Sequence, residues 1–333
     1  MLYQVMRYTH IFAPEIWFKQ CHASALSILP DGALGVVWFG GDHEKAPNVG
    51  IWFSKCPRTG KETGVWTVPK KIADREDIPC WNPVLLSGAD GLRLFYKVGK
   101  EIPTWQTMMK FSADIGETWS EETEAVPGDI GGRGPVKNKC IRLLDGAVLA
   151  PASTELNGWN SFIDRSEDGG RTWTRSDNIE IDRTENPEAG IIQPTLWQDE
   201  IGAVHALLRS NTGHIYKSES QDGGRTWSCA EKTGLPNNNC GIDVVRMESG
   251  RLVLVYNPVS GNWAARTPIA FSVSDDNGKT WSEPEILSHQ PCDKNAVHAE
   301  FSYPAVIADG EDLYITYTWK RQTVAFWHVR FAD

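Results

Sequence analysis

An eight-residue pattern, Ser-x-Asp-x-Gly-x-x-Trp, occurs four times in this chain of 333 residues. The copies begin at Ser112, Ser166, Ser220 and Ser274 and end at Trp119, Trp173, Trp227 and Trp281, so successive tryptophans lie 54 residues apart. A fixed period of this length is typical of repeat architectures, in which each unit buries its apolar face only against its neighbours. The repeat therefore predicts a single domain over residues 1–333.

The residues of this pattern have the chemistry of a tight turn. Asp accepts hydrogen bonds from nearby backbone N–H groups, and Gly adopts a positive φ at little cost. The Trp ring can pack beneath the turn, and the hydroxyl groups can tie the loop to itself. We interpret the four copies as loops that stabilise hairpins without contacting a ligand.

A second repeated element, a turn ending in Gly followed by a short alternating strand, indicates the number of units. It occurs at Gly32, Gly91, Gly146, Gly202, Gly250 and Gly310. Such alternation is the signal of a hairpin, and no stretch keeps a helical period. Short β units repeated radially give a propeller, so we predict an all-β, six-bladed β-propeller with four strands per blade.

The two ends of the chain depart from the regular repeat. The first unit has only a worn copy of the eight-residue pattern, Gly64-Val65-Trp66. The segment from Tyr8 to Phe12 is predicted to add the outer strand of the last blade, whose own C-terminal strand is expected from Thr323 to Arg330.

Composition excludes several classes of partner. The net charge of −10 argues against a nucleic-acid or anionic-membrane binder. The cysteines at positions 21, 56, 80, 140, 229, 240 and 292 are odd in number and form no CxxC pair, so we expect reduced thiols and a cytoplasmic protein. We expect no secretion signal in residues 1–30 and no membrane span, because no apolar run approaches about 18 residues. No metal or cofactor is expected, because no HxH, HExxH or spaced carboxylate cluster occurs.

The predicted first strand of each blade lines the central channel and begins about nine residues before each turn glycine. The six starts are Cys21-His22-Ala23-Ser24, Trp81-Asn82-Pro83, Lys137-Asn138-Lys139, Gln193-Pro194, Asn239 to Asp243, and Glu300 to Pro304. Each blade offers a different polar group at the same end of the channel. Diverse polar groups that converge on one axis are expected of a binding site.

The eight-residue repeats resemble the Asp boxes, or BNR repeats, of the sialidase superfamily. The strings CHAS at 21, WNPVL at 81, PVKNK at 135, LLRS at 207, GID at 241 and EFSYPAVI at 300 resemble the group labelled predicted neuraminidases. The resemblance covers essentially the whole chain and implies a sialidase-like propeller. Asp boxes also occur in arabinan-cleaving enzymes, polysaccharide lyases and non-catalytic propellers, so they do not define an activity.

The resemblance assigns roles to three residues. Tyr303 resembles the sialidase nucleophile, with Glu300 as the base that it needs, because a neutral phenol is a poor nucleophile. Arg209 resembles one of three arginines that grip the substrate carboxylate, which a guanidinium can bind bidentately.

Three departures from the sialidase pattern argue against sialic acid itself as the substrate. Where the family carries its first arginine, this chain has Lys19 to His22. The expected acid/base Asp before Val49 is replaced by Asn48, which leaves Asp42 or Glu44 as substitutes. Only Arg246 and Arg266 are candidates for the third arginine.

Further candidates come from the residue types at the channel. His22 stands where the family's arginine is lost, and imidazole can act as acid or base near neutral pH. A channel histidine that only hydrogen-bonds a neighbour is the alternative. Other candidates are Lys97, Lys137 and Lys139 for an anion, Asn82, Gln193, Asn239 and Asp243 for sugar hydroxyls, and Trp81, Trp105, Trp159 and Trp263, of which one or two could stack on a sugar.

Three functions remain open. The first is an exo-acting, sialidase-like glycoside hydrolase for an acidic glycan, sialylated or uronate-linked, with Tyr303 and Glu300 as the nucleophile system and Asp42 or Glu44 as the acid. The second is a lyase or a rhamnosyl-glucuronate-cleaving enzyme that uses His22. The third is a non-catalytic glycan-binding propeller. The expected partner in each case is a glycan, and the oligomeric state is left open.

Overall fold

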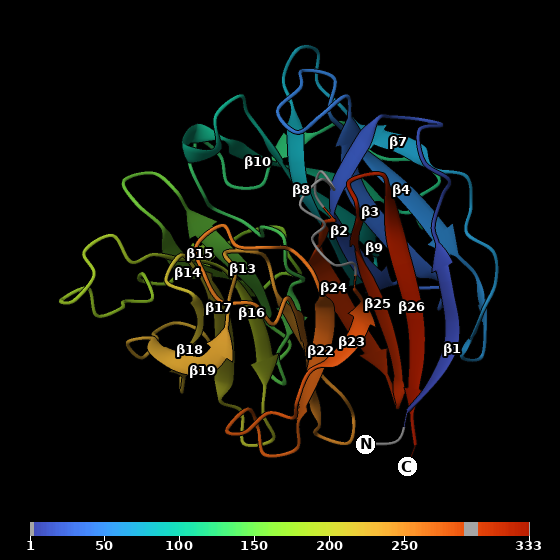
Figure 1. The fold of residues 1–333 in the computed structure, drawn as a ribbon. Coiled ribbons are helices and arrows are strands. Elements are labelled where there is room, and N and C mark those ends of the chain that lie inside the picture. Colours follow the sequence, from blue (N-terminus) through green and yellow to red (C-terminus); the bar gives the residue numbers. More distant parts are fainter. Residues whose placement is uncertain (1–2, 290–298, 333) are drawn as a thin grey trace.

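The computed structural model describes residues 3–289 and 299–332. These residues form six four-stranded antiparallel sheets, arranged as blades around a common axis (Figure 1). Inner strands of adjacent blades contact one another at β2 and β8, β2 and β24, β16 and β20, and β20 and β24. The predicted six-bladed, all-β propeller is confirmed.

The blades follow one another along the chain. Blade 1 contains β2 (Gln20–Ile28), β3 (Leu34–Gly41), β4 (Gly50–Cys56) and β7 (Lys70–Ala73), with a small hairpin of β5 (Arg58–Thr59) and β6 (Glu62–Thr63). Blade 2 contains β8 (Cys80–Gly88), β9 (Gly91–Val98), β10 (Gln106–Ser112) and β11 (Thr123–Glu124), with a 3-10 turn at Ile102–Thr104. Blade 3 contains β12 (Ile141–Arg142), β13 (Val148–Thr154), β14 (Asn160–Ser166) and β15 (Thr174–Arg175).

The second half of the ring has the same order. Blade 4 contains β16 (Ile191–Gln198), β17 (Val204–Ser210), β18 (His214–Ser220) and β19 (Glu231–Pro236). Blade 5 contains β20 (Asp243–Arg246), β21 (Leu252–Tyr256), β22 (Ile269–Ser274) and β23 (Glu285–Ser288). Blade 6 contains β24 (Phe301–Asp309), β25 (Asp312–Trp319), β26 (Thr323–Phe331) and, as its outer strand, β1 (Tyr3–His10).

The N-terminal strand closes the ring. β1 pairs antiparallel with β26, with Tyr3 opposite Phe331 and His10 opposite Ala325, so the expected exchange is present although the strand lies a few residues earlier than predicted. Phe12 then leaves the sheet and stacks on Trp38 of blade 1 at 4.8 Å between ring centroids. The N-terminal segment therefore holds the last blade to the first.

The four Asp boxes have the same hydrogen bonds. In each, the Ser hydroxyl donates to the Asp carboxylate at 2.8 Å, and the Gly N–H donates to the Ser oxygen at 2.8 Å. The Trp side chains pack toward the preceding blade, as Trp119 does on Phe53 and Trp173 on Phe95. Trp66 of the worn copy packs in the same way on Phe326 of blade 6.

The strand order separates the two ends of the propeller. Each box connects the third strand of a blade to the fourth, and each turn glycine connects the first strand to the second, so both lie at one end. The starts of the inner strands and the loops between second and third strands lie at the other end. We call this other end the site end; it is uppermost in Figure 1.

Two further expectations concern thiols and membranes. The thiols of Cys21, Cys56, Cys80, Cys140, Cys229 and Cys240 are free, and Cys292 lies outside the described residues. In the part of the chain that the structure describes, no helix has the length and apolar character needed to cross a bilayer.

Candidate functional site

At the site end, each blade has one residue in the left-handed backbone region, either within its inner strand or, in blades 3 and 5, in the segment that leads into it. These residues, with φ in degrees, are Ala23 (53), Asn82 (42), Lys137 (65), Gln193 (53), Asn239 (61) and Tyr303 (52). In blades 1, 2, 4 and 6 the strand register shifts at this point, as a β-bulge does. A positive φ is uncommon for residues other than Gly and is often found at functional sites. We call these six residues the left-handed ring.

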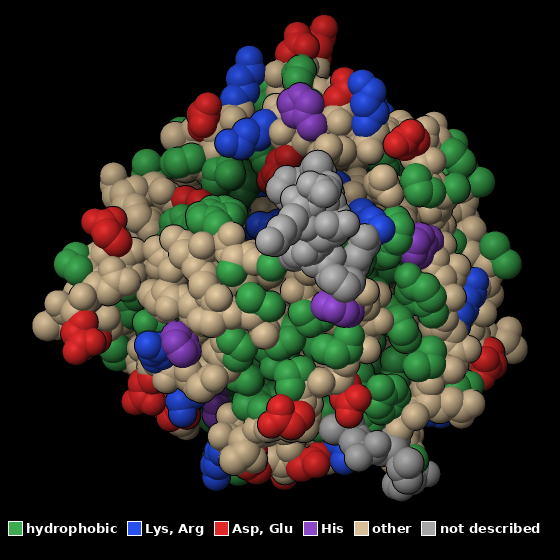
Figure 2. Space-filling view, in the orientation of Figure 1, with side chains coloured by type: hydrophobic (Ala, Val, Ile, Leu, Met, Phe, Trp, Pro, Cys, Tyr) green, Lys and Arg blue, Asp and Glu red, His purple; other side chains and the backbone are tan. Residues whose placement is uncertain are grey.

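A cavity of about 680 Å³ opens at the site end. Figure 2 shows a hollow in the upper part of the molecule with hydrophobic, basic and acidic side chains around it. Its lining includes all four tryptophans singled out from the sequence, Trp81, Trp105, Trp159 and Trp263. Trp263 is 66% exposed and has a φ of 56°, so this residue combines a solvent-exposed apolar ring with an uncommon backbone conformation.

Three arginine side chains line this cavity. Arg209 of β17 is 3% exposed, and its Nη1 donates to the Tyr303 hydroxyl at 2.7 Å. Arg266 donates to Glu300 at 2.7 Å, and Arg321 donates to Glu300 at 2.9 Å. The structure thus brings Arg209 and Arg266 together, whereas Arg246 pairs with Glu200 away from the cavity.

Tyr303 and His22 lie side by side at the base of the cavity, with ring centroids 4.1 Å apart. The Nδ1 of His22 is 2.8 Å from the Thr318 hydroxyl. Burial lowers the pKa of His22 well below its ordinary value, and the positive charges of Arg321, Arg266 and Arg209 lower it further. His22 is therefore neutral at neutral pH. Among the described residues, its Nε2 has no hydrogen-bond partner.

Glu300 lines the cavity, but its oxygens are already occupied. Besides Arg266 and Arg321, the Ser302 hydroxyl donates to it at 2.5 Å. Burial alone would raise the pKa of Glu300, but the charges of Arg321 and Arg266 outweigh burial and lower it to about 2. So weak a base fits the binding of two arginines better than the activation of Tyr303.

The two substitutes for the missing acid have different positions. Glu44 lines the cavity and accepts a hydrogen bond from Arg321 at 2.8 Å. Asp42 does not line it: the side chain is exposed and pairs with Lys19 at 3.0 Å. Lys19 lowers the pKa of Asp42 by hydrogen bonding and by its charge, and a hydrogen bond with the Asn48 side chain also lowers it.

Of the remaining ring residues, Asn82 and Gln193 line the cavity and Asn239 lies behind it. Asn239 accepts from Arg209 Nε at 3.0 Å, and Gln193 accepts from Arg209 Nη1 at 2.9 Å. The two amide oxygens therefore fix the orientation of the guanidinium.

Lys137, Lys139 and Asp243 lie deeper along the channel and do not line the cavity. The Lys137 ammonium donates to the carbonyls of Ile242 and Pro304, at 2.7 and 2.5 Å, so it joins blades 3, 5 and 6. Asp243 accepts from Lys139 at 2.8 Å and from the backbone N–H of Val306 at 2.9 Å. In these positions the three side chains hold blades together.

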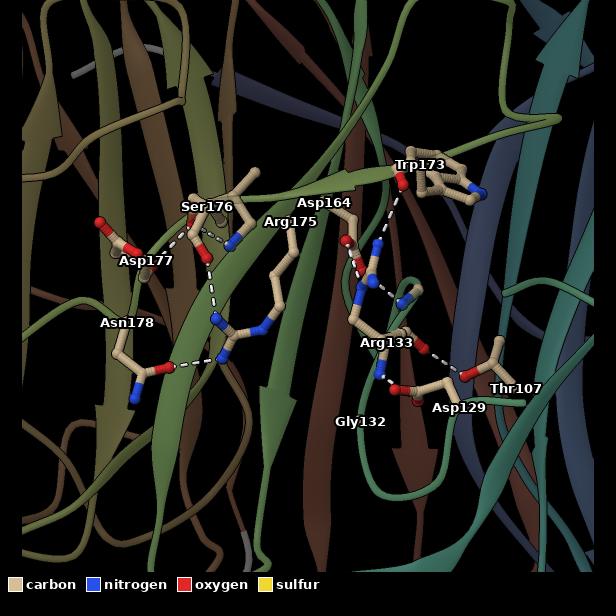
Figure 3. A network of polar contacts seen from close by, with 12 residues as sticks. Thr107, Asp129, Gly132, Arg133, Asp164, Trp173, Arg175, Ser176, Asp177 and Asn178 are labelled. Carbon is tan, nitrogen blue, oxygen red and sulfur yellow. Dashed lines mark hydrogen bonds and ion pairs between the residues drawn. The ribbon is translucent and has the colours of Figure 1, made fainter. Parts of the chain in front are cut away.

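Lys97 is also turned away from the cavity. Its ammonium donates to the Thr107 hydroxyl at 2.6 Å and to the carbonyl of Arg133 at 3.0 Å. Figure 3 shows the adjoining network, in which Arg133 pairs with the fully buried Asp164 at 2.7 Å and Thr107 donates to the Arg133 carbonyl. This network fixes the long connection between blades 2 and 3.

Sequence reasoning missed Arg321 and Glu155. Both lie in loops between the second and third strands of a blade, as do Glu44, Trp105, Trp159, Trp263 and Arg266. Five blades contribute to the cavity in this way. Once the strand order was predicted, the charged and aromatic residues in these loops could have been recognised as candidates for the cavity.

The cavity has no cluster suited to a metal. Within residues 3–289 and 299–332, no group of three or more His, Cys, Asp or Glu side chains could hold a metal ion. The polar groups that line the site include guanidinium, ammonium, carboxyl, amide, phenol, imidazole and indole groups.

Comparison with known proteins identifies the family. Residues 32–315 match the family described as BNR repeat-like domain. A protein of unknown function from Dyadobacter fermentans is similar in structure (15% identity, TM-score 0.77, 99% of each chain covered). So are the Hadza microbial sialidase Hz136 (17%, 0.78, 97% of this chain and 68% of that one) and the intramolecular trans-sialidase of Ruminococcus gnavus (14%, 0.72, 98% and 97%). At these identities the likeness shows a shared propeller fold, and the family match over residues 32–315 means that this chain belongs to the BNR repeat-like family.

Proposed function

We propose that this protein is an exo-acting glycoside hydrolase for a glycan that carries a carboxylate, a sialic acid or a uronate. The observation that carries the proposal is the convergence of Arg209, Arg266 and Arg321 on one cavity that also holds the Tyr303 hydroxyl. Guanidinium groups bind carboxylates strongly and with defined geometry. In a chain of net charge −10, such a cavity attracts an anion to one place.

The rest of the lining suits a sugar ring. Trp81, Trp105, Trp159 and Trp263 offer apolar faces for the C–H surface of a pyranose. Asn82 and Gln193 each offer both a donor and an acceptor, which sugar hydroxyls require. The structures of the Ruminococcus gnavus trans-sialidase with oseltamivir carboxylate and of the Trypanosoma rangeli sialidase with DANA support a ligand in this type of propeller.

In the proposed reaction Tyr303 is the nucleophile. Its phenol oxygen bonds to the anomeric carbon while the bond from that carbon to the leaving oxygen breaks, and the bonding pair stays with the leaving oxygen. Arg209, which donates to the same phenol oxygen at 2.7 Å, stabilises the negative charge that develops there when the phenol loses its proton. Water then attacks the anomeric carbon and releases Tyr303.

His22 is the proposed acceptor of the phenol proton. If Nδ1–H donates to Thr318, Nε2 carries the free lone pair beside Tyr303. In the free protein, burial is the largest cause of the lowered pKa of His22, and three nearby arginines lower this pKa further. A substrate carboxylate bound to those arginines offsets their charge and raises the pKa of His22, so the base gains strength when substrate is present.

The neutral His22 beside Tyr303 also favours a second candidate, an eliminating lyase. In that reaction the base removes the proton α to a uronate carboxylate, the electron pair forms a carbon–carbon double bond, and the leaving oxygen departs from the β carbon. The arginines neutralise the carboxylate and so make the α proton more acidic. The two candidates share a substrate class and differ in product.

A product analysis tests both candidates. Purified protein is incubated with sialylated and uronate-containing oligosaccharides, and products are followed by chromatography and ultraviolet absorbance. Release of a saturated acidic sugar, lost in Arg209→Met, supports the hydrolase. A product with the absorbance of an unsaturated uronate selects the lyase. Binding without turnover of any substrate contradicts both and selects a glycan-binding propeller.

A further inference from the structure

Among the described residues, three carboxylates line the cavity, and they differ in how they are held. Glu300 pairs with Arg266 and Arg321, and Glu44 pairs with Arg321. No ion pair to Glu155 is present in the same part of the chain. A carboxyl group that must give and regain a proton cannot be fixed as a carboxylate by a salt bridge, so Glu155 differs from the other two in the property that proton transfer needs.

Glu155 is partly withdrawn from solvent. It lies in the loop between β13 and β14, half-buried, in the same short loop as Trp159. Burial raises the pKa of Glu155 above its ordinary value of 4.5, and the charge of Arg209 and a hydrogen bond with Trp159 oppose that rise in part. The other charged groups of the cavity are Glu44, Lys45 and the pairs already described.

The propeller places Glu155 and Tyr303 on opposite blades. Glu155 comes from blade 3 and Tyr303 from blade 6, and in a ring of six these two blades face each other across the axis. Both residues line the same cavity. A nucleophile and the donor of a proton to the leaving group must approach the anomeric centre from opposite sides.

The two carboxyl groups in the loop of blade 1 are not in a state suited to proton donation. Asn48 carries an amide, which has no acidic proton, and its Oδ1 accepts a hydrogen bond from the backbone N–H of Asp42 at 3.1 Å. Asp42 points to solvent beside Lys19, and Glu44 is paired with Arg321.

We propose that Glu155 is the catalytic acid of this site and that it donates its carboxyl proton to the leaving oxygen. As the bond from the anomeric carbon to that oxygen breaks, the oxygen keeps the bonding pair, takes the proton and leaves as an alcohol, and Glu155 becomes a carboxylate. In the second step the carboxylate accepts a proton from the attacking water, which restores the acid. The inference rests on the proposed hydrolase function.

The test varies the leaving group. Wild type and Glu155→Gln are compared on a 4-methylumbelliferyl glycoside of the preferred acidic sugar and on the same sugar linked to lactose. We expect kcat/KM of Glu155→Gln to fall about 10²- to 10⁴-fold with the lactose glycoside. With the aryl glycoside, whose leaving group needs no proton, we expect a loss below about tenfold. An equal loss on both substrates, or no loss on either, overturns the inference. Glu188→Gln, the same change at an exposed position outside the cavity, is the matched control and should behave as wild type.

A measurement without turnover separates failure of this inference from failure of the proposed function. Infrared difference spectra between wild type and Glu155→Gln, recorded as pH is raised through the ordinary glutamate pKa, should show the C=O stretch of a protonated wild-type carboxyl group that persists above that pKa. Its absence means that Glu155 is ionised and contradicts the acid role, whatever the activity. If the band is present but wild type turns over no substrate, the proposed hydrolase function is what fails.

Discussion

At the end of the propeller that carries the Asp boxes, four loops share the same Ser, Asp, Gly and Trp positions and the same hydrogen bonds. At the site end, the six residues of the left-handed ring share a backbone conformation, but their side chains are mostly different. Where side chains repeat, they make the same contacts in each of four blades. Where only the backbone conformation repeats, the side chain is free to differ, and it is there that the cavity lies. The comparison separates residues that hold the fold from residues that act on a ligand.

The left-handed ring is itself divided by depth. Asn82, Gln193 and Tyr303 reach the cavity, whereas Lys137 and Asn239 make internal contacts. At Gly241 an added Cβ would lie 2.8 Å from the Lys137 side chain and 3.5 Å from the Tyr303 ring, so the deeper layer packs directly against the nucleophile candidate. A left-handed conformation costs about 1 kcal/mol or more for a residue with a side chain. The deeper contacts stabilise the backbone that aims the upper side chains.

The largest effect is expected from Tyr303→Phe. Loss of the nucleophilic oxygen should lower kcat at least about 10³-fold, which corresponds to about 4 kcal/mol of transition-state stabilisation. The unfolding free energy should change by less than about 1 kcal/mol, because one hydrogen bond to Arg209 is lost. Steady-state kinetics and thermal unfolding check the two parts. Tyr317→Phe, which removes a hydroxyl bonded to Ser288 away from the cavity, is the control and should keep wild-type kcat.

Trp173→Ala in the second Asp box should have the opposite signature. Removal of a ring packed on Phe95 of the preceding blade should lower the unfolding free energy by about 3 kcal/mol. The kcat of the remaining folded protein should be unchanged. Trp263→Ala supplies the matched comparison, since this exposed ring contributes little to the core and should affect kinetics alone. A loss of kcat in folded Trp173→Ala would contradict the separation of the two ends.

The fold was predictable from the sequence because the Asp boxes and turn glycines form locally hydrogen-bonded turns. These turns recur at a regular spacing, which can be recognised in the sequence. The strand starts were predictable for the same reason, and Tyr303, His22, Asn82 and Gln193 line one cavity. Arg209, which was a candidate only through the family resemblance, lines the same cavity. The spacing of the repeat could not show which of these side chains line the cavity and which are buried deeper in the channel. Lys137, Lys139 and Asp243 lie at or just before the starts of inner strands. Their side chains bind buried carbonyl and hydroxyl groups of other blades, which the sequence of a single strand does not reveal.

The residues in loops between second and third strands could not be predicted from the sequence either. Arg321 lies in a tight turn of blade 6 with a φ of 59°, and Glu155 in an irregular loop of blade 3. Neither has a motif, because a loop at the rim can reach the cavity from many sequences. Their roles depend on which residues lie across the ring, and that requires coordinates.

A pH-dependent effect follows from Glu300. The charges of Arg321 and Arg266 outweigh burial and hold its pKa at about 2, below the ordinary 4.5. A lowered carboxyl pKa stabilises the fold above the unfolded pKa, and that stability is lost as pH falls from about 4.5 through about 2. The loss should approach about 3 kcal/mol. Denaturant unfolding of wild type and Glu300→Gln over this range should show a steeper decline in wild type, and parallel declines would mean that Glu300 is not held by its arginines.

The smallest effects on kcat/KM are expected from substitutions of Asp42 and Glu44. These two residues lie in the same loop, yet we expect their substitutions to differ in effect. Asp42→Asn removes one member of an exposed pair with Lys19, and kcat/KM should stay within about twofold of wild type. Glu44→Gln removes a cavity carboxylate that orients Arg321, and kcat/KM should fall about tenfold, mainly through KM. Kinetics of the two variants over a range of pH measures both. If Asp42→Asn shows the larger loss, the loop of blade 1 rearranges to bring Asp42 to the substrate, and the acid then comes from blade 1 after all. If both variants stay near wild type, the position of Arg321 is set by Glu300 alone, to which its Nε already donates at 2.9 Å.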